Sequence, residues 1–188
     1  MLAPHECQIS TPPVMLCIQQ VIKEADAPSW LRSVPHNFGE AQAGTLKADE
    51  WRTMATVFLP LALVSMWGEG SVHPSKEVAD HLCRVLDHTM HLVSAIQIAC
   101  YRVMTVSRMT AYQACIISWL ADLKQILPDA PLRPNAHMAC HIYDYLKLFG
   151  PVRAWWCFPF ERLISQLQRL PTNHKFGSLT KVYARLVH

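Results

Sequence analysis

Apolar residues recur along most of this chain at the three- and four-residue spacing of an amphipathic helix. The strongest example covers residues 71–105, where one face carries Val78, Leu82, Val85, Leu86, Leu92, Val93 and Ile96. Ser75 can cap this segment, and Glu77 falls in the first turn, where a helix favours negative charge. We therefore predict one long helix in the middle of the chain.

Shorter segments with the same periodicity lie on both sides and end at glycine or proline. They predict helices over residues 14–25, 47–67, 107–127, 135–149, 158 or 160 to 170, and 178–187. Pro60 should bend or split the second of these, because proline lacks an N–H and its ring clashes with the preceding turn. No window alternates clearly as a strand would, although 152–157 could form a short extended piece. We therefore predict a mostly α-helical fold with an irregular N-terminus (1–13) and a single helical domain (14–188).

Composition agrees with a folded domain and excludes a disordered chain. Of the 188 residues 51% are hydrophobic and only 16% are charged, against about 25% in typical domains, whereas disorder needs the opposite balance. The N-terminus lacks the apolar stretch of a secretory signal, and no segment reaches the ~18 apolar residues of a membrane span. We therefore expect an intracellular protein, nuclear or cytoplasmic, that does not use a membrane.

Charge is unevenly divided along the chain. Residues 1–100 hold 6 basic and 10 acidic side chains, whereas residues 101–188 hold 11 basic and 4 acidic ones. A basic half is typical of a protein with a polyanionic partner such as DNA, and an ordinary solvated surface is the alternative explanation. No phosphate-binding loop, nucleophile elbow, kinase loop or dinucleotide-binding motif occurs in the sequence.

Seven cysteines occur, and no two have the C-x-x-C spacing of a metal or redox pair. A reducing compartment fits this pattern best. We expect most of these cysteines to be small buried apolar residues.

One cluster of metal-binding side chains is predicted on the helix that begins near residue 135. His137, Cys140, His141 and Asp144 follow one another at helical spacing and share a face. Imidazole and thiolate are the donors that Zn²⁺ prefers, and two histidines four residues apart can reach one ion. One helix cannot complete a tetrahedron, so other ligands would have to come from elsewhere. The alternative is a polar helix face without metal.

Glu161 is the only acidic residue after Asp144, and it follows an aromatic segment at residues 155–160. A carboxylate beside such a segment can be partly desolvated, which suits metal binding or acid–base chemistry. The alternative is an ordinary first-turn glutamate that interacts with the helix dipole. A further polar face on the long helix, made of His81, Arg84, His88 and His91, is typical of a solvated or partly buried surface.

Three groups of motifs together resemble a known family. The first comprises Pro28-Ser29-Trp30-Leu31, Gly39-Glu40 and residues 44–52, and the second is Leu86-Asp87-His88-Thr89-Met90-His91. The third and most specific comprises residues 134–141, 149–152, 156–162 and 172–175. From about residue 14 onward the chain resembles the C-terminal part of fungal CACTA-like transposases, which are DDE enzymes of the RNase H-like superfamily.

This resemblance implies metal-dependent DNA strand cleavage and transfer by three carboxylates around two Mg²⁺ or Mn²⁺ ions. The third carboxylate stands on a helix after a helical insertion, and Glu161 has that position. The fold would then be a helical bundle that corresponds to this insertion and the last catalytic helix, without the sheet. Basic side chains available to DNA phosphates are Arg153, Arg162, Arg169 and Lys175.

A more distant similarity to the catalytic subunit of the V(D)J recombinase adds a zinc site. In that relative the histidine that matches His141 binds zinc with a neighbouring histidine and an upstream cysteine pair. His137 is then the second candidate, although it stands one residue closer to His141 than its counterpart does. The chain would supply half of such a site.

The sequence lacks the two earlier aspartates and the C-x-x-C pair of the family. We therefore expect a C-terminal fragment of a transposase that is inactive alone, with the upstream RNase H-like half or a full-length transposase as its partner. A helical protein-interaction or zinc-binding module without nuclease activity is the alternative. If low charge reflects a surface for the missing half, an exposed apolar patch should lie near Trp155, Trp156 and Phe158.

Overall fold

The computed structural model describes residues 11–31, 33–128, 131 and 133–168, and these form helices and connecting segments without any strand. The predicted all-helical class is thus confirmed. The chain divides into two compact units, residues 1–155 (the first unit) and 156–188 (the second unit). Whether 14–188 acts as one domain stays a prediction. Among the described helices, none is both long and apolar enough to cross a membrane.

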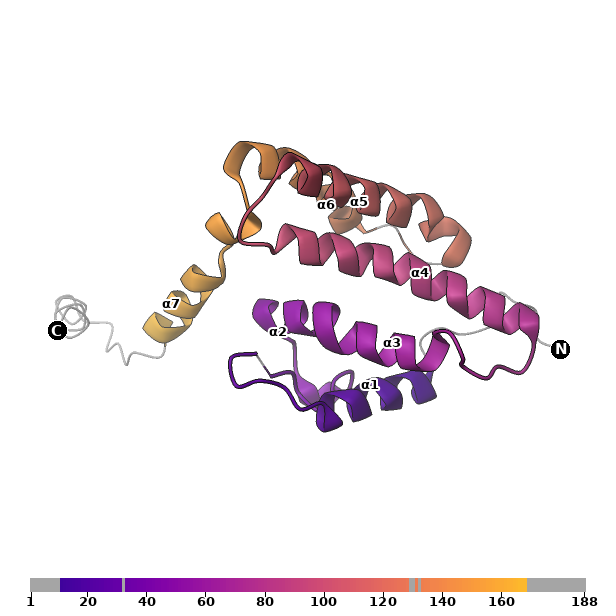
Figure 1. The fold of residues 1–188 in the computed structure, drawn as a ribbon. Coiled ribbons are helices and arrows are strands. Elements are labelled where there is room, and N and C mark those ends of the chain that lie inside the picture. Colours follow the sequence, from indigo (N-terminus) through magenta and orange to yellow (C-terminus); the bar gives the residue numbers. More distant parts are fainter. Residues whose placement is uncertain (1–10, 32, 129–130, 132, 169–188) are drawn as a thin grey trace, which may run out of the picture. The chain divides into compact units, whose positions relative to one another are not determined.

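The observed helices start and end close to the predicted positions (Figure 1). They are α1 (Pro12–Glu24), η2 (Ala41–Ala43), α2 (Ala48–Thr53), η3 (Met54–Phe58), α3 (Leu59–Trp67), α4 (Lys76–Ala99), α5 (Val106–Ile126), α6 (Pro134–Phe149), η4 (Val152–Ala154) and α7 (Phe158–Gln168). The extended piece expected at 152–157 is wrong, because its first residues form the 3₁₀ turn η4. The helix predicted over 178–187 lies outside the described residues.

Helix α4 begins after the predicted cap, Ser75, and so later than residue 71, and it ends earlier than residue 105. The Ser75 hydroxyl accepts a hydrogen bond from the Val78 N–H (3.3 Å), which satisfies one of the unpaired donors of the first turn. The helix ends at Ala99 instead of near 105, because Thr105 adopts extended backbone angles and caps the next helix, accepting from the Arg108 N–H (3.3 Å). The intervening residues 100–105 form a short turn between α4 and α5.

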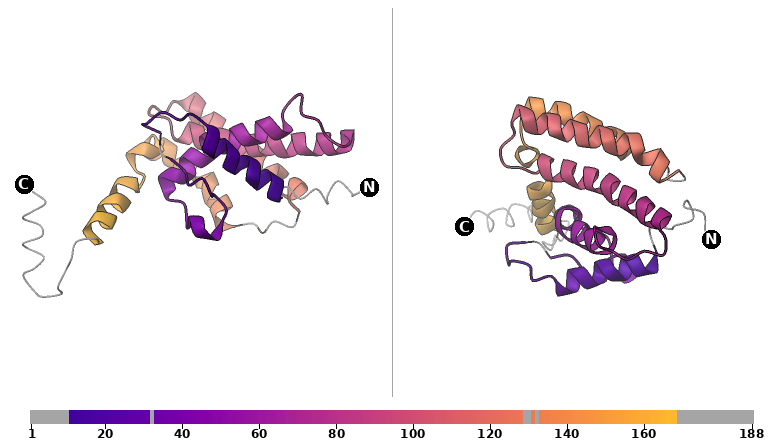
Figure 2. Two further views of the ribbon diagram at one scale, coloured as in Figure 1. Left: turned by 90° about the horizontal axis from the view of Figure 1, so that it is seen from below. Right: turned by 45° about the vertical axis from the view of Figure 1, so that its right-hand side comes forward.

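The helices of the first unit pack in chain order (Figures 1 and 2). Helix α4 runs antiparallel to α3 on one side and to α5 on the other, while α6 packs on α5 and α1 packs on α3. Three apolar clusters hold these pairs together. Their buried members are Ile18, Ile22, Val34, Leu46, Met54, Phe58 and Ala62; Leu63, Trp67, Val85 and Leu86; and Ala95, Ala99, Tyr112, Ile116 and Leu146.

Pro60 changes the helix in which it lies without breaking it. A π-helical turn (η3) precedes it, and α3 continues with Pro60 in its first turn, so the hydrogen-bond register changes here. Proline cannot donate to the carbonyl of Thr56, four residues earlier. That carbonyl accepts from the Gln97 amide of α4 (3.4 Å), so the proline leaves an acceptor that ties two helices together.

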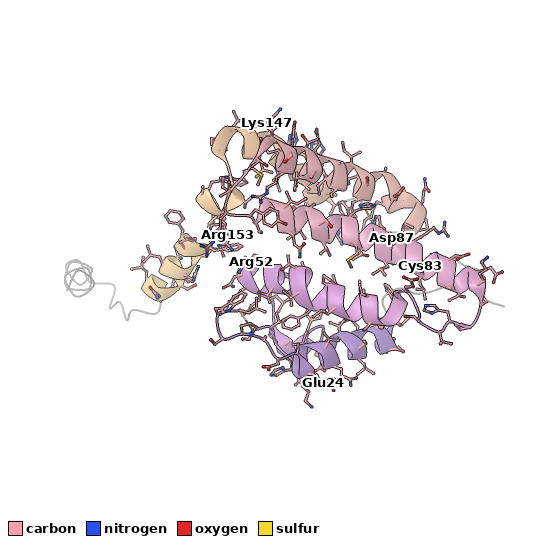
Figure 3. All side chains as sticks on the ribbon, in the orientation of Figure 1. Glu24, Arg52, Cys83, Asp87, Lys147 and Arg153 are labelled. Atoms are coloured by element: carbon pink, nitrogen blue, oxygen red, sulfur yellow. The ribbon has the colours of Figure 1, made fainter. Side chains whose placement is uncertain are left out.

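The cysteines are less buried than predicted. Among the six in the described residues all are free thiols and none is buried: Cys17, Cys100 and Cys115 are half-buried, and Cys83, Cys140 and Cys157 are exposed. Cys83, for example, is exposed on α4 (Figure 3), and its thiol donates to the Trp67 carbonyl at the end of α3 (3.7 Å). The prediction of small buried apolar residues is therefore wrong.

The histidine face of α4 is partly buried, as expected from the sequence. His88 is 5% exposed, stacks on the Trp119 ring (centroids 6.0 Å apart) and donates from Nε2 to the Trp119 carbonyl (2.9 Å). Burial lowers the pKa of His88, against opposing effects of that carbonyl and the Asp122 carboxylate; the charge of His91 lowers it further. Burial likewise lowers the pKa of His81, and the charge of Arg84 acts in the same direction.

The lowered pKa values of His81 and His88 predict that the protein loses stability in mild acid. The unfolded chain takes up a proton near the ordinary histidine pKa of 6.5, whereas the folded state resists protonation to lower pH. The contribution is therefore fully present above about pH 6.5 and lost as pH falls below it. The free energy of unfolding, measured with urea at pH 7.5 and at pH 5.5, should differ less between the two pH values for His88→Gln than for the wild type. An unchanged difference would contradict the prediction, and His36→Gln, at an exposed position, is the control.

Candidate functional site

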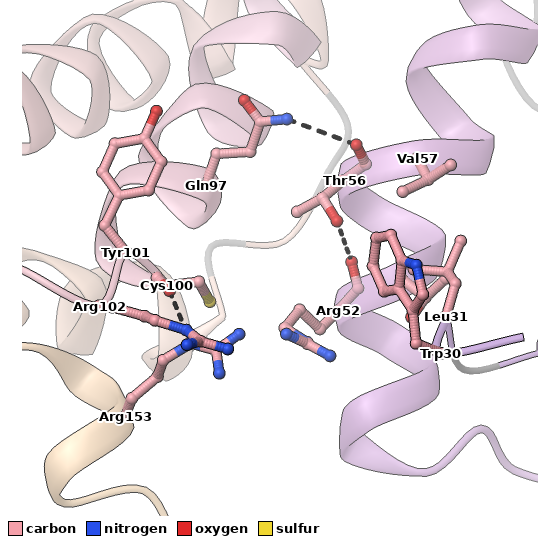
Figure 4. A pocket seen from close by; sticks show the side chains of 11 residues that line it. Trp30, Leu31, Arg52, Thr56, Val57, Gln97, Cys100, Tyr101, Arg102 and Arg153 are labelled. Carbon is pink, nitrogen blue, oxygen red and sulfur yellow. Dashed lines mark hydrogen bonds between the residues drawn. The ribbon is translucent and has the colours of Figure 1, made fainter. Parts of the chain in front are cut away.

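A cavity of about 700 Å³ opens in the first unit, between the helix that contains α2 and η3 and the end of α4 (Figure 4). Its size falls within the usual range of small-ligand sites. Four stretches of the chain contribute to it, and the lining residues are Trp30, Leu31, Arg52, Thr53, Thr56, Val57, Gln97, Cys100, Tyr101, Arg102 and Arg153.

Three of the lining side chains are arginines, and none of the lining residues is acidic. Arg52 comes from α2, Arg102 from the turn after α4, and Arg153 from η4. Arg52 and Arg153 are far apart in the sequence but line the same cavity, from opposite sides in Figure 4. In Figure 4 the Arg52 side chain extends toward the side on which Arg102 and Arg153 lie. The lining therefore carries net positive charge, which suits an anion.

Hydrogen bonds between elements hold the walls of the cavity in place. The Arg153 Nε donates to the Cys100 carbonyl (2.9 Å), which joins η4 to the end of α4. On the opposite wall the bond from Gln97 to Thr56 joins α4 to η3, and the Thr56 hydroxyl donates to the Arg52 carbonyl (2.8 Å). The end of α4 is thus bonded both to η4, which carries Arg153, and to η3, which follows Arg52 in the chain.

The turn that carries Arg153 is set by the residues around it. Gly150 ends α6 with φ +75°, a left-handed conformation that glycine adopts without strain. The Trp155 indole donates back to the Gly150 carbonyl (3.1 Å) and its ring meets that of Tyr145 edge-on at 5.9 Å. This closed turn keeps η4 against the end of α6.

The charge of the cavity acts on the Cys100 thiol. Burial raises the pKa of Cys100 above its usual value, and the positive charges of Arg52 and Arg153 lower it by a smaller amount. Burial wins, so the thiol stays protonated at neutral pH and is a poor nucleophile. The cavity is therefore suited to binding an anion more than to cysteine chemistry.

Two aromatic rings complete the lining. Trp30 is 82% exposed, so most of its indole surface is available to a ligand. Tyr101 is also exposed, and the Arg108 guanidinium lies over its ring at 4.6 Å from the centroid. Aromatic faces beside guanidinium groups are a combination found in proteins that bind nucleotides or nucleic acids.

Of the basic residues predicted to contact DNA, Arg153 lies in this cavity and Arg162 lies on α7 in the second unit. The Arg162 Nε donates to the Phe158 carbonyl (3.4 Å) within its own helix. Arg169 and Lys175 lie outside the described residues. Glu161 is exposed in the first turn of α7, where its N–H donates to the Cys157 carbonyl (2.9 Å).

Glu161 by itself does not form a two-metal site. It is the only carboxylate side chain of the second unit, and two divalent ions need several oxygen ligands. In the described part of the chain no three His, Cys, Asp or Glu side chains gather closely enough to hold a metal ion.

The two predicted zinc ligands do lie together on α6. The Nε2 atoms of His137 and His141 are 3.1 Å apart, and their rings meet edge-on with centroids 4.8 Å apart. Two nitrogens at that distance can both lie ~2.0–2.1 Å from one zinc ion. Cys140 is exposed on the same helix, and its thiol donates to the Ala136 carbonyl (4.0 Å).

The three rings at the expected centre of the predicted apolar patch are not exposed. Trp155, Trp156 and Phe158 are half-buried, and in the second unit Trp156 stacks on Phe158 with centroids 4.5 Å apart. Exposed apolar side chains occur close by in the sequence: Leu148 and Phe149 at the end of α6, and Phe160, Leu163 and Ile164 on α7. The aromatic rings themselves therefore do not form the exposed surface.

Two of the three arginines and Trp30 are not among the site residues predicted from the sequence. Trp30 and Arg52 stand within the first group of family-like motifs, and Arg102 stands in none of the three groups. The one signal for Arg102 was its place in the basic half, whereas Arg52 stands in the acidic half.

Comparison with protein families gives one match. Residues 99–180 match the family model described as "Domain of unknown function (DUF4218)". This part of the chain is therefore similar to that family. It includes Arg102, both histidines of α6, Arg153 and Glu161, and excludes Trp30 and Arg52. No curated protein and no solved structure matches the chain.

Proposed function

We propose that this protein is the helical C-terminal part of a transposon-derived DDE transposase and that it binds DNA phosphates in the arginine-lined cavity. The observation that carries the DNA-binding proposal is the convergence of Arg52, Arg102 and Arg153 on one cavity without an acidic lining residue. Arginine suits this role because its planar fork of donors matches phosphate oxygens.

The transposase assignment rests on the motif resemblance and agrees with the all-helical fold. In the complete enzyme Glu161 would be one of the carboxylates that hold Mg²⁺ or Mn²⁺, and the chemistry supplied by such ions would be Lewis-acid assistance of phosphodiester cleavage. Its exposure on the first turn of α7 leaves the carboxylate accessible for such a role. The remaining carboxylates would come from the RNase H-like part.

DNA binding through the cavity predicts a steep dependence on salt. The chain should retain duplex DNA at ~50 mM salt and release it by ~200 mM, because phosphate contacts release counterions. Arg102→Gln should weaken binding to all sequences alike and reduce the slope of log K against log salt by about 1. Fluorescence anisotropy measures both quantities.

Arg84→Gln is the matched control, because Arg84 is exposed on α4 and does not line the cavity. If duplex DNA is not retained at ~50 mM salt, the DNA-binding proposal is wrong and a protein-interaction module is favoured. If Arg84→Gln and Arg102→Gln have equal effects, binding is general and not centred on the cavity.

Strand cleavage by this chain alone is not expected. A single carboxylate cannot position two metal ions, so incubation with Mn²⁺ should leave supercoiled plasmid intact. Glu161→Gln distinguishes a contaminating nuclease, which would cut equally with both proteins. Nicking that occurs with the wild type and disappears in Glu161→Gln would show that the chain is an active enzyme.

A second candidate function is zinc binding on α6, favoured by the 3.1 Å approach of the His137 and His141 Nε2 atoms. Neutral imidazoles are good zinc donors, and the short distance between the two nitrogens supports binding of one ion by both. They would supply two of the four usual ligands and hold part of the complete protein together, a structural role without chemistry of its own.

Zinc titration by calorimetry tests this site directly. We expect one Zn²⁺ per chain, bound more weakly at lower pH because protons compete for the imidazole nitrogens. His141→Ala should abolish binding, whereas His36→Ala, at an exposed residue away from α6, should leave it unchanged. Absence of zinc binding, or equal binding by both variants, would remove His137 and His141 as ligands in this chain.

A further inference from the structure

The arginine-lined cavity combines two kinds of recognition group. Its charged part consists of Arg52, Arg102 and Arg153, which suit a phosphate. Its aromatic part consists of Trp30 and Tyr101. A site for a simple anion needs the first part alone, so the second part points to a ligand with a flat apolar group.

Trp30 is the aromatic residue best placed to receive such a group. Its ring is 82% exposed at the cavity, whereas Tyr101 already has the Arg108 guanidinium 4.6 Å above its ring centroid. In Figure 4 Trp30 stands on the same wall as Arg52, so a ligand could touch both. Planar bases stack on an exposed indole irrespective of their sequence, since every base has a π-face.

The lining also contains the polar side chains of Thr56 and Gln97. The Thr56 hydroxyl donates to the Arg52 carbonyl, and its oxygen can still accept a hydrogen bond from a ligand. The Gln97 amide donates to the Thr56 carbonyl and holds that residue in place. A cavity of about 700 Å³ has room for a base, a sugar and a phosphate together.

We propose that the cavity binds a nucleoside phosphate, with its base stacked on Trp30 and its phosphate held among Arg52, Arg102 and Arg153. The phosphate monoester carries a charge of about −1.5 to −2 at neutral pH, which the three guanidinium groups complement. This inference rests on the proposed function, because both require the same three arginines to bind phosphate. Its new element is recognition of the base.

Calorimetry with the full chain separates the contributions of base and phosphate. The probes are deoxyadenosine 5′-monophosphate (dAMP), 2-deoxyribose 5-phosphate and inorganic phosphate. We expect dAMP to bind about tenfold more tightly than the sugar phosphate, the order of magnitude that base–aromatic stacking supplies. Equal affinities for dAMP and sugar phosphate would overturn the inference.

Variants assign these contributions to residues. Trp30→Ala should reduce the affinity for dAMP to that for the sugar phosphate and leave the sugar phosphate unaffected, whereas Trp30→Phe should keep part of the advantage. Because Trp30 is largely exposed, its replacement should not unfold the chain. Arg102→Gln should lower the affinity for all three probes, whereas Arg84→Gln should leave all three affinities unchanged. An unchanged affinity for dAMP in Trp30→Ala or Arg102→Gln would contradict the site.

Two further measurements identify the source of the nucleotide and separate this inference from the proposed function. Displacement of dAMP by single-stranded oligodeoxyadenosine would show that the nucleotide can belong to a strand, and failure to displace it would show a free nucleotide. Salt-dependent duplex binding with no preference for dAMP over sugar phosphate would overturn the inference alone. Preference for dAMP without duplex binding would overturn the proposed function and support the nucleotide site.

Discussion

Helix α4 has to be buried on two sides, and the arrangement of the first unit depends on that constraint. Near its start Val85 and Leu86 pack against α3, and near its end Ala95 and Ala99 lie beneath α5 and α6. The small alanines allow the neighbouring helices to approach closely. Burial on both sides also encloses His88, whose ring must find a partner because an unpaired buried polar group is costly. The Trp119 carbonyl supplies that partner and fixes α5 against α4.

The cavity exists because this packing ends abruptly. After Ala99 the chain leaves the helix, since Thr105 is committed to capping α5, and the turn places Cys100 and Arg102 at the open end of the bundle. The opposite wall depends on Pro60, which leaves the Thr56 carbonyl for the amide of Gln97. A change of hydrogen-bond register on one side and the end of a helix on the other thus define the two walls, and the carbonyl of Cys100 holds Arg153 at the end of α4.

The sequence predicted the helices well, because apolar periodicity, the Ser75 cap and the stop at Gly150 act over a few neighbouring residues. It predicted the proximity of His137 and His141 for the same reason, since both stand on one helix four residues apart. It failed on features set by distant contacts. The early end of α4, the exposure of Cys83 and the gathering of Arg52 with Arg153 depend on which helices pack together, and helical periodicity does not specify this.

Charge shows most clearly why the local sequence was a poor guide to the site. The sequence is acidic before residue 100 and basic after it, which directs attention to the second half. The cavity draws Arg52 and Trp30 from the acidic half and Arg102 and Arg153 from the basic half. Electrostatic attraction of a ligand depends on charges within about 10 Å, the screening length near 0.1 M salt. The net charge of a stretch of sequence therefore says little about an anion site, and the fold decides which of its charges act together.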